Sequence, residues 1–424
     1  MEAVYMEKII FHIDVNSAFL SWEAVYRLHV LGYNRDLRTI PSAVAGDVKK
    51  RHGIILARST PAKSYGVRTG DMISDALKLC PQLMLVPPHY NLYQTCSSAF
   101  MQLLCNFSPC VEPYSIDEAF CDMTQTVALY GTPVVAANLI KDRIKCELGF
   151  TVNIGISNNK LLAKMASDFT KPDKVHTLFP EEVPSKMWPL PVGDLFFVGR
   201  ATEKRLRTLG ITTIGELARA DVRVLRSHLK KHGEIIHDFA NGVDVSLVSD
   251  TTPANKGYGN STTIAFDVDD VDTAKLVLLG LSETVATRLR EDNVLATVVA
   301  VDIVDHEFRH VSHQATLYTG TNQTQYIYQS ACRLFEELWD GTPIRHLGVH
   351  TSKVVEDNGI RQLDLFQMNR YEKLEKLDKA IDNIRGRYGA DSVMRASFIN
   401  SRIYHMSGGI SPEKRKVDYK DVKL

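Results

Sequence analysis

Cysteine chemistry is scarce in this sequence. Seven cysteines occur among 424 residues, and none of them forms a CxxC pair or another metal-ligand spacing. An odd number of cysteines without such a framework predicts reduced thiols and a cytoplasmic protein.

Long hydrophobic runs are also missing. No stretch approaches the roughly 20 apolar residues of a membrane-spanning helix. The first residues, MEAVYMEKIIFHID, lack the basic and apolar regions of a secretory signal. The chain has no net charge either, because 50 basic residues match 50 acidic ones. We therefore expect no membrane contact, while whole-chain charge neither predicts nor excludes a nucleic-acid partner.

What is present is the composition of an ordinary globular protein. Hydrophobic residues make up 44% and charged residues 24% of the 47.5 kDa chain. A chain of this length predicts two to four domains rather than one hydrophobic core.

The first 184 residues predict a sheet domain interrupted by a lobe. Residues 8–13 form a compact apolar run that predicts a buried strand, and Ser17 is the expected N-cap of a helix that carries Phe19. Residues 30–85 predict a separate small lobe with short strands, glycine turns and a short helix.

The segments after the lobe complete the predicted sheet. They are a helix at 90–107, strands on both sides of residues 117 and 118, a helix at 131–149 between Thr132 and Gly149, a strand at 151–157, and a helix capped by Ser157. Without the lobe, the order is strand, helix, helix, strand, strand, helix, strand. This order predicts a split βαβ arrangement within an α/β multidomain (α+β) fold.

Two adjacent acids stand in this region. In YSIDEAF, residues 114–120, Asp117 and Glu118 interrupt a run that otherwise predicts buried strand. For an isolated pair, a polar hairpin tip facing water is the simpler explanation, because ionised carboxylates are costly to bury without a cation. In a split βαβ sheet, however, the end of the first strand can lie beside this hairpin, so that Asp14 joins the pair. Three carboxylates at one sheet edge fit divalent cations better than a solvated turn does.

Two further regions follow the sheet domain. Residues 190–247 predict a helical unit with glycine-containing turns, and residues 257–350 predict a β/α domain with strands at 293–304 and 310–319. The last 70 residues contain a charged helix and a basic end.

Three segments, in order along the chain, resemble the Y-family DNA polymerases of the bacterial DinB/UmuC translesion class. They are the junction HIDVNSAF, the acidic YSIDEAF, and GISNNKLLAKMASDFTKPD. LFFVGRATEKRLRTLGI is similar to the family's thumb, and ELWDGTPIRHLGV to the end of its little finger. DVN, in place of the more frequent DxD, points to the UmuC-like branch.

The resemblance implies a domain for each part of the chain. The domains are a palm at 1–28 and 86–184, inserted fingers at 29–85, a helical helix-hairpin-helix thumb at 185–247, a β/α little finger at 254–353, and a C-terminal tail at 354–424.

The resemblance also implies a metal site for two Mg²⁺ ions. Asp14, Asp117 and Glu118 match the family's metal ligands, and the Val15 carbonyl can add a backbone ligand. The expected reaction is attack of a primer 3′-hydroxyl on the α-phosphate of a dNTP, with release of pyrophosphate.

Residues that meet the incoming nucleotide follow from the same resemblance. Phe19 occupies the steric-gate position, where an aromatic ring excludes the 2′-hydroxyl of a ribonucleotide, although core packing is the alternative for this side chain. Lys171 matches the lysine that contacts the triphosphate. Thr60 and Lys63, in TPAK, replace the usual Tyr and Arg, and a lysine lacks the bidentate fork of an arginine.

Contacts to primer-template DNA are expected from three regions. Lys160 and Lys164 share a helical face and are equally compatible with solvated surface. The thumb can present backbone N–H groups to phosphates at a helix N-terminus. In the predicted little finger, 8 basic residues stand against 13 acidic ones, which implies weak intrinsic DNA binding. The remaining expected contacts are Gly199, Arg200 and Lys204 in the thumb, and Arg288, Arg290, Arg309 and Arg345 in the little finger.

A short motif in the tail suggests a protein partner. QLDLF, with Gln362, Leu363, Leu365 and Phe366, matches the pentapeptide by which bacterial polymerases bind the sliding clamp, the β subunit. An apolar segment that packs on its own protein is the alternative.

The sequence thus predicts an error-prone, template-directed DNA polymerase for translesion synthesis, without a proofreading exonuclease. A non-catalytic, clamp-tethered DNA-binding factor is the main alternative, and the complete set of three acids argues against it. A nucleotidyl cyclase with a palm fold is a third reading, which leaves the thumb, the little finger and the clamp motif unexplained.

Overall fold

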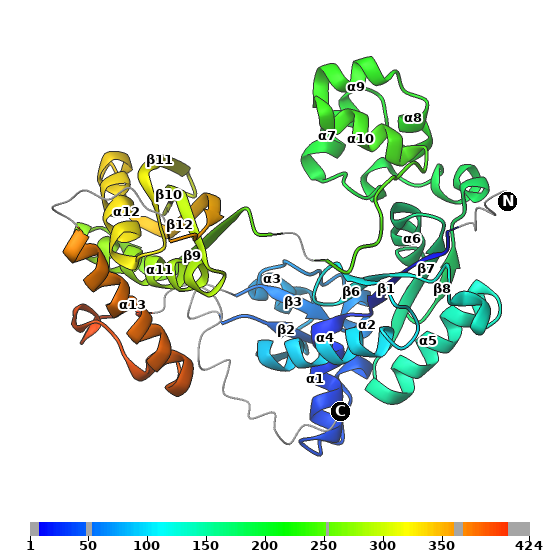
Figure 1. Ribbon diagram of the computed structural model, residues 1–424. Coiled ribbons are helices and arrows are strands. Elements are labelled where there is room, and N and C mark those ends of the chain that lie inside the picture. The colour runs from blue at the N-terminus through cyan, green and yellow to red at the C-terminus, as the bar shows by residue number, and fades with distance from the viewer. Residues whose placement is uncertain (1–7, 48–52, 252–253, 360–367, 406–424) are drawn as a thin grey trace. The chain divides into compact units, whose positions relative to one another are not determined.

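The computed structural model describes residues 8–47, 53–251, 254–359 and 368–405 (Figure 1). Contacts divide the chain into two compact units, the first built mainly from residues 1–45 and 55–252, and the second mainly from residues 253–416. The four-domain division expected from the sequence stays a prediction, and the two units are described separately below.

The first unit contains a five-stranded sheet in the order β5-β6-β1-β7-β8. Strand β1 (Ile10–Val15) lies at the centre and pairs antiparallel with both β6 (Glu118–Asp122) and β7 (Val152–Ser157). The edges are β5 (Val111–Pro113) and β8 (Val175–Thr177). Since β5 and β6 form a hairpin and β1 lies between β6 and β7, the split βαβ prediction is confirmed.

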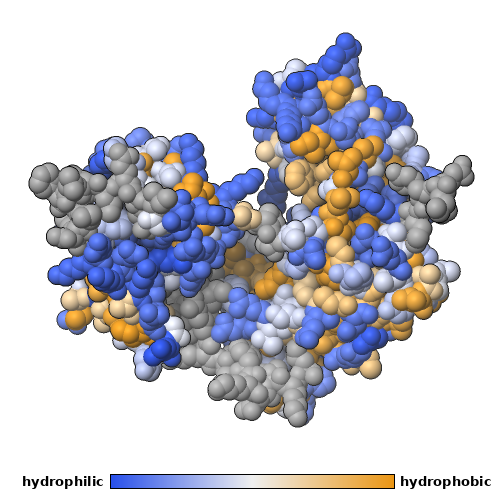
Figure 2. Space-filling model, viewed as in Figure 1, coloured by the Kyte–Doolittle hydropathy of each residue, from blue (hydrophilic) through white to orange (hydrophobic). Residues whose placement is uncertain are grey.

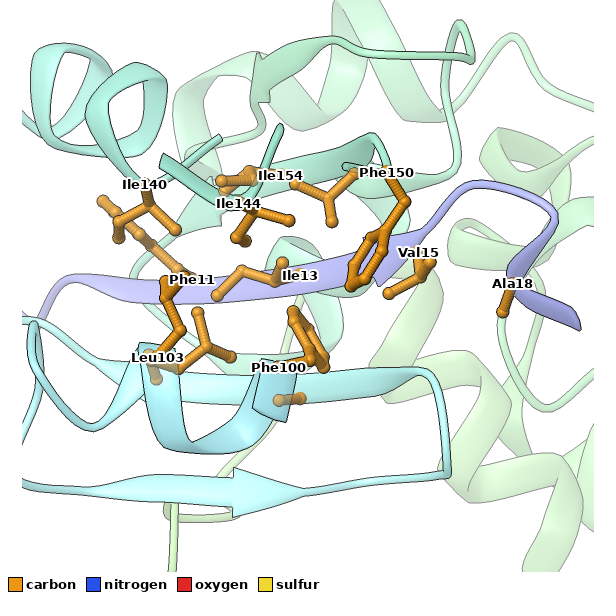
Figure 3. Close-up of a cluster of buried hydrophobic side chains, with 14 of the residues drawn as sticks. Phe11, Ile13, Val15, Ala18, Phe100, Leu103, Ile140, Ile144, Phe150 and Ile154 are labelled. Atoms are coloured by element: carbon orange, nitrogen blue, oxygen red, sulfur yellow. The ribbon is translucent and has the colours of Figure 1, made fainter. Parts of the chain in front are cut away.

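The two faces of this sheet have different partners. Phe11, Ile13 and Val15 point into a core formed with α4 (Tyr90–Leu104) and α5 (Pro133–Leu148), as Figure 3 shows. The alternate residues, including His12 and Asp14, lie on the face covered by α6 (Lys160–Ser167), because successive strand side chains point to opposite sides. Helix α6 packs closely there: a Cβ on Gly155 of β7 would stand 1.9 Å from the Ala163 carbonyl oxygen.

Of the three helix caps predicted from the sequence, the structure confirms one and corrects two. Thr132 caps α5, since its hydroxyl accepts from the Val135 amide, and Gly149 ends the helix with φ 77°. Ser17 precedes α1 (Ala18–His29), but it adopts φ 48° and its side chain makes no cap hydrogen bond. Ser157 belongs to β7 and donates to the Leu178 carbonyl, while Asn159 caps α6.

The expected lobe forms a small three-stranded sheet in the order β3-β2-β4. Its strands are β2 (Ser42–Ala45), β3 (Ile55–Arg58) and β4 (Met84–Val86), and its helices are α2 (Thr60–Ser64) and α3 (Ile73–Leu79).

Four short helices make up the expected thumb within the first unit. They are α7 (Arg200–Thr208), α8 (Ile214–Ala218), α9 (Val222–Leu229) and α10 (Lys231–Ala240). Leu206, Ile214, Leu225 and Ile236 are fully buried and join them into one core. Figure 2 shows hydrophobic residues on the visible face of this part, and Phe197 and Val245 are among the exposed apolar side chains.

The second unit is built on a four-stranded antiparallel sheet in the order β11-β10-β12-β9. Helices α11 (Val271–Glu291) and α12 (Thr324–Leu338) pack on one face of it. The sequence predicted β10 (Val294–Asp305) and β11 (His310–Thr321) but missed β9 (Gly257–Val268) and β12 (Ile344–Glu356).

The C-terminal segment is part of this second unit rather than a free tail. Helix α13 (Met368–Tyr388) contributes the buried Tyr371 and Asp378, and Phe398 and Ile403 join the core of the unit. Glu283 of α11 is 3% exposed and is held by Arg385 and Arg395 from this segment. The tail expected at 354–424 stays a prediction as a domain, and its residues 368–405 contribute side chains to the core and ion pairs of this unit.

Candidate active site

One cavity in the first unit gathers the residues that the sequence singled out for chemistry. Its volume is about 460 Å³, and it is enclosed by the end of β1, the start of α1, the lobe, and the β5–β6 hairpin. Its lining includes Asp14, Val15, Phe19, Thr60, Lys63, Asp117, Glu118 and Lys171. It also includes Arg38 and Arg58, which sequence reasoning missed.

Strand register places Asp14 beside the acidic pair. Asp14 lies opposite Glu118 in the β1–β6 ladder, and the Val15 amide donates to the Asp117 carbonyl at 3.0 Å. Asp14 is only 8% exposed. Burial raises its pKa to about 6, and the nearby Lys171 ammonium only partly opposes that effect.

The two neighbouring acids lie in different surroundings. Asp117 precedes β6 and its Oδ1 accepts from the Ser115 hydroxyl at 2.8 Å, while burial raises its pKa. Burial acts in the same direction on Glu118, but His12 and Lys164 outweigh it and lower the pKa of Glu118 to about 2. The Lys164 ammonium lies 2.9 Å from Glu118 Oε2, and His12 Nε2 lies 3.6 Å from the same oxygen.

Protein cations contact two of the three acids. The Lys171 ammonium contacts Asp14 and lies 2.8 Å from Asp168. Among the residues that the structure describes, no three His, Cys, Asp or Glu side chains are grouped tightly enough to hold a metal ion as they stand. The donor set still suits a hard divalent cation, because carboxylate oxygens on two adjacent rigid strands face one cavity. A cation there would replace charge that the lysines now supply.

Phe19 lies on the cavity wall at the start of α1. Its ring is half-buried and stacks on the Tyr93 ring, with 4.4 Å between centroids and 11° between planes. Phe19 therefore has both a surface toward the cavity and an aromatic backing. A steric-gate role and a core-packing role are therefore both compatible with the position of Phe19, because one face of its ring lines the cavity and the other packs on Tyr93.

The lobe contributes basic side chains to the cavity. Helix α2 begins at Thr60, with the Ser59 hydroxyl accepting from the Ala62 amide as its cap. Burial lowers the pKa of Lys63, and the Arg58 and Lys171 charges add to this effect. Mutual repulsion of cations at one wall favours an anionic ligand between them. Arg58 directly precedes the STPAK segment, and this position was the one available sequence signal for it.

Two of the expected DNA contacts, Lys160 and Lys164, form ion pairs within the first unit. Lys160 lies 2.6 Å from Glu112 Oε1, and Lys164 is 8% exposed against Glu118. The Lys164 ammonium also lies near the rings of Tyr114 and Phe196, at 5.4 and 5.6 Å from the centroids. Both ammonium groups neutralise acids on β5 and β6, and their contact with DNA stays a prediction.

Of the other expected DNA contacts, some are exposed to solvent and others already contact groups within the protein. Gly199, Arg200 and Lys204 are exposed around the N-terminus of α7. In the second unit, Arg290 forms ion pairs with Asp378 and Asp382, and its expected DNA contact stays a prediction. Arg288 donates to the Gly259 carbonyl, Arg309 pairs with Asp305, and the Arg345 guanidinium lies over the Phe308 ring. The clamp motif at Gln362 to Phe366 lies outside the described residues.

Comparison with known proteins assigns the chain to a family. Family models match the impB/mucB/samB family at residues 13–168, its C-terminal domain at 255–365, and the IMS family HHH motif at 180–211. A protein of Clostridium acetobutylicum named DNA polymerase IV is 45% identical over 92% of this chain and 98% of its own length. The chain belongs to the impB/mucB/samB family of Y-family DNA polymerases.

Other relatives agree with this membership. A protein of Bacillus subtilis named DNA polymerase IV 2 is 36% identical over 93% of this chain and 95% of its own length. A solved Y-family DNA polymerase chimera, Dbh-Dpo4(243-245)-Dbh, shares the fold with a TM-score of 0.70 and 22% identity, over 82% of this chain and all of the chimera. The palm, thumb and little finger architecture is confirmed. The narrower UmuC-like branch stays a prediction.

No helix within the described ranges has the length and apolarity needed to cross a bilayer.

Proposed function

We propose that this Y-family DNA polymerase copies damaged templates by adding dNMP to a primer 3′-hydroxyl in the 460 Å³ cavity. The observation that carries the proposal is the meeting, in one cavity, of three acids, an aromatic wall and a basic wall. These acids and basic side chains line the same cavity, which is proposed to hold a nucleoside triphosphate.

The acids are the proposed ligands of two Mg²⁺ ions. Asp14, Asp117 and Glu118 would hold them, and the Val15 carbonyl is the proposed backbone ligand. When bound, such ions lower the pKa of the attacking hydroxyl and neutralise the charge on the triphosphate.

The other cavity residues bind and orient the nucleotide. Lys63, Arg58 and Lys171 supply positive charge for the triphosphate, and Thr60 supplies a hydroxyl donor. Transfer of the Lys171 ammonium from Asp14 to a phosphate oxygen exchanges one anion for another and frees the Asp14 carboxylate. Phe19 forms the wall against which a ribose 2′-hydroxyl would clash.

Further parts of the proposal concern DNA and protein partners. The exposed N-terminus of α7, with Arg200 and Lys204, fits contact with phosphates, and Arg288, Arg309 and Arg345 remain candidates in the second unit. The acidic balance of the predicted little finger supports weak intrinsic DNA binding and a tether through QLDLF to a sliding clamp. We also propose low fidelity, because chemistry for proofreading was not found in the sequence, and a cytoplasmic location.

Primer extension with purified protein and undamaged template tests the assignment. Asp117→Asn and Glu118→Gln should each abolish dNMP incorporation while primer-template binding persists, since loss of a metal ligand typically costs several kcal/mol of transition-state stabilisation. Asp122→Asn is the matched control: this acid ends the same strand and accepts from the Thr124 amide, away from the cavity lining. A tenth of wild-type activity in either ligand variant would refute the metal assignment.

A further inference from the structure

A fully buried carboxylate stands behind the aromatic wall of the cavity. Glu23 lies one helical turn after Phe19 on α1, and its side chain is 0% exposed. The Tyr93 hydroxyl donates to Glu23 Oε1 at 2.9 Å, and His89 Nδ1 lies 2.6 Å from the same oxygen. The Arg27 Nε lies 3.5 Å from Oε2. The cavity lining includes Phe19 but not Glu23, so the proposed chemistry does not account for this buried acid.

The buried acid is connected to Phe19 through Tyr93. Tyr93 is fully buried on α4, and its ring stacks on the Phe19 ring with 4.4 Å between centroids. Burial, and then the Glu23 carboxylate, raise the pKa of the Tyr93 phenol, so that its hydroxyl remains a donor. A tyrosine ring fixed at its hydroxyl end cannot slide along its neighbour. The position of the Phe19 ring is therefore defined from behind.

We propose that Glu23, His89 and Tyr93 position the Phe19 ring and thereby determine how strictly the cavity excludes nucleotides that carry a 2′-hydroxyl. This inference rests on the proposed role of Phe19 as the wall against the ribose. The three residues are positioning residues, because Phe19 alone faces the cavity. Holding helix α1 against α4 is the competing role for the same contacts.

The geometry favours positioning for two reasons. First, both His89 and Tyr93 contact the same oxygen of Glu23, so the carboxylate cannot turn without losing both partners. Second, apolar residues already join α1 to α4: Trp22, Leu92 and Phe100 are buried in one shared core. A buried polar side chain is a costly way to add helix packing where apolar side chains suffice.

The test is the ratio of incorporation efficiencies for dNTP and the matching rNTP, measured by single-nucleotide primer extension. Tyr93→Phe keeps the stacked ring and removes the hydroxyl alone. We expect its dNTP/rNTP ratio to fall by about tenfold, since a displacement of about 1 Å at a positioned group changes rates by up to about a hundredfold. The efficiency with dNTP should fall by less than the ratio does.

A second pair of variants keeps the test valid if Tyr93→Phe does not fold. His89 is 25% exposed at its side chain and so tolerates substitution better. His89→Leu should lower the ratio, and His89→Gln, which can still donate to Glu23, should restore most of it. Ile140→Val, a truncation in the core on α5, is the control for lost stability and should leave the ratio unchanged.

The Phe19→Ala background separates this inference from the function on which it rests. If Phe19 is the wall, Phe19→Ala alone lowers the ratio, and adding Tyr93→Phe then lowers it no further. Loss of discrimination in Phe19→Ala with wild-type ratios in Tyr93→Phe and His89→Leu overturns the positioning role and leaves the wall intact. An unchanged ratio in Phe19→Ala overturns the wall itself, and absence of any dNTP incorporation by the wild type overturns the proposed function.

Discussion

Lys171 and Asp14 form an ion pair in the lining of the 460 Å³ cavity. The resemblance had given them separate tasks, one at the triphosphate and one at a metal ion. In the proposed function, this contact makes nucleotide binding and metal binding draw on the same pair of charges. A ligand that takes either partner changes the environment of the other.

The raised pKa of Asp14 predicts a pH-dependent cost to stability in metal-free buffer. Burial raises this pKa from 3.8 to about 6, so between these values the folded chain binds more protons than the unfolded chain. The free energy of unfolding therefore falls as pH rises through this window, by up to about 3 kcal/mol. Asp14→Asn should remove the fall, so its stability relative to wild type should rise between pH 4.5 and pH 7.

Urea unfolding with EDTA at several pH values measures this difference. Comparing the two proteins cancels the opposite contribution of Glu118, whose lowered pKa reduces stability at more acidic pH. Added Mg²⁺ should stabilise the wild type more than the variant above pH 6. A stability difference that is flat from pH 4.5 to pH 7 would show that Asp14 titrates normally.

Lys164 and Arg200 should differ in their effect on the salt dependence of DNA binding. Arg200 is exposed at the start of α7, so Arg200→Ala should lower the slope of log K against log salt by about one. Lys164 is buried against Glu118, so Lys164→Met should leave that slope unchanged while lowering polymerase activity. Fluorescence anisotropy of labelled DNA at several salt concentrations measures these slopes. Equal slope changes in both variants would restore Lys164 as a phosphate contact.

Anchoring of the C-terminal segment should contribute to the stability of the second unit. Arg395→Met or Arg385→Met leaves the buried Glu283 short of a partner, which should cost about 3 kcal/mol of that unit's stability. Lys379→Met on α13 is the control, because its pair with Glu375 is exposed and should contribute under about 1 kcal/mol. Urea denaturation of the full chain gives both values. Similar effects in the two kinds of variant would contradict a buried anchor.

Clamp stimulation should depend on the QLDLF motif. Replacing Leu365 and Phe366 with alanine should remove the clamp's stimulation of synthesis and leave clamp-free activity unchanged, because a tether acts by raising the local concentration of the enzyme at primer ends. Primer extension with and without clamp, at low and at physiological salt, measures it. Stimulation that survives the double substitution would mean that QLDLF packs on its own protein.

Many elements of the fold could be predicted from local sequence patterns, and the elements that were missed have weak or ambiguous local patterns. The apolar run of β1 and the Thr132 to Gly149 caps gave correct elements because each signal is strong within a few residues. Strands β9 and β12 were missed because buried positions do not alternate regularly along them, so that the period-two signal of a strand is weak. Ser157 was misread as a cap because a hydroxyl near a helix start also suits a strand end.

The sequence predicted many of the residues that line the cavity, but it did not predict the ion pairs they form. Asp14 and Glu118 follow from motifs, and strand register brings them together. The sequence did not predict that Lys160 and Lys164 form ion pairs with acids on β5 and β6. Spacing on a helix shows that two residues share a face, but it does not show what packs against that face. Glu23 gave no signal at all, since an acid on an amphipathic helix ordinarily faces water, and only the packing of α1 against α4 buries it.

The central place of β1 has a consequence for how the polymerase is made. Its ladder partners β6 and β7 begin at Glu118 and Val152, far behind it in the order of synthesis. At about 5–20 residues per second, roughly 7 to 28 s separate the emergence of β1 from that of its second partner. Through that interval the apolar segment of β1 has neither of the strands that cover its edges, and unpaired edges are sites where other chains can pair. Until both partners have been made, the sheet edge that places Asp14 opposite Glu118 cannot be complete.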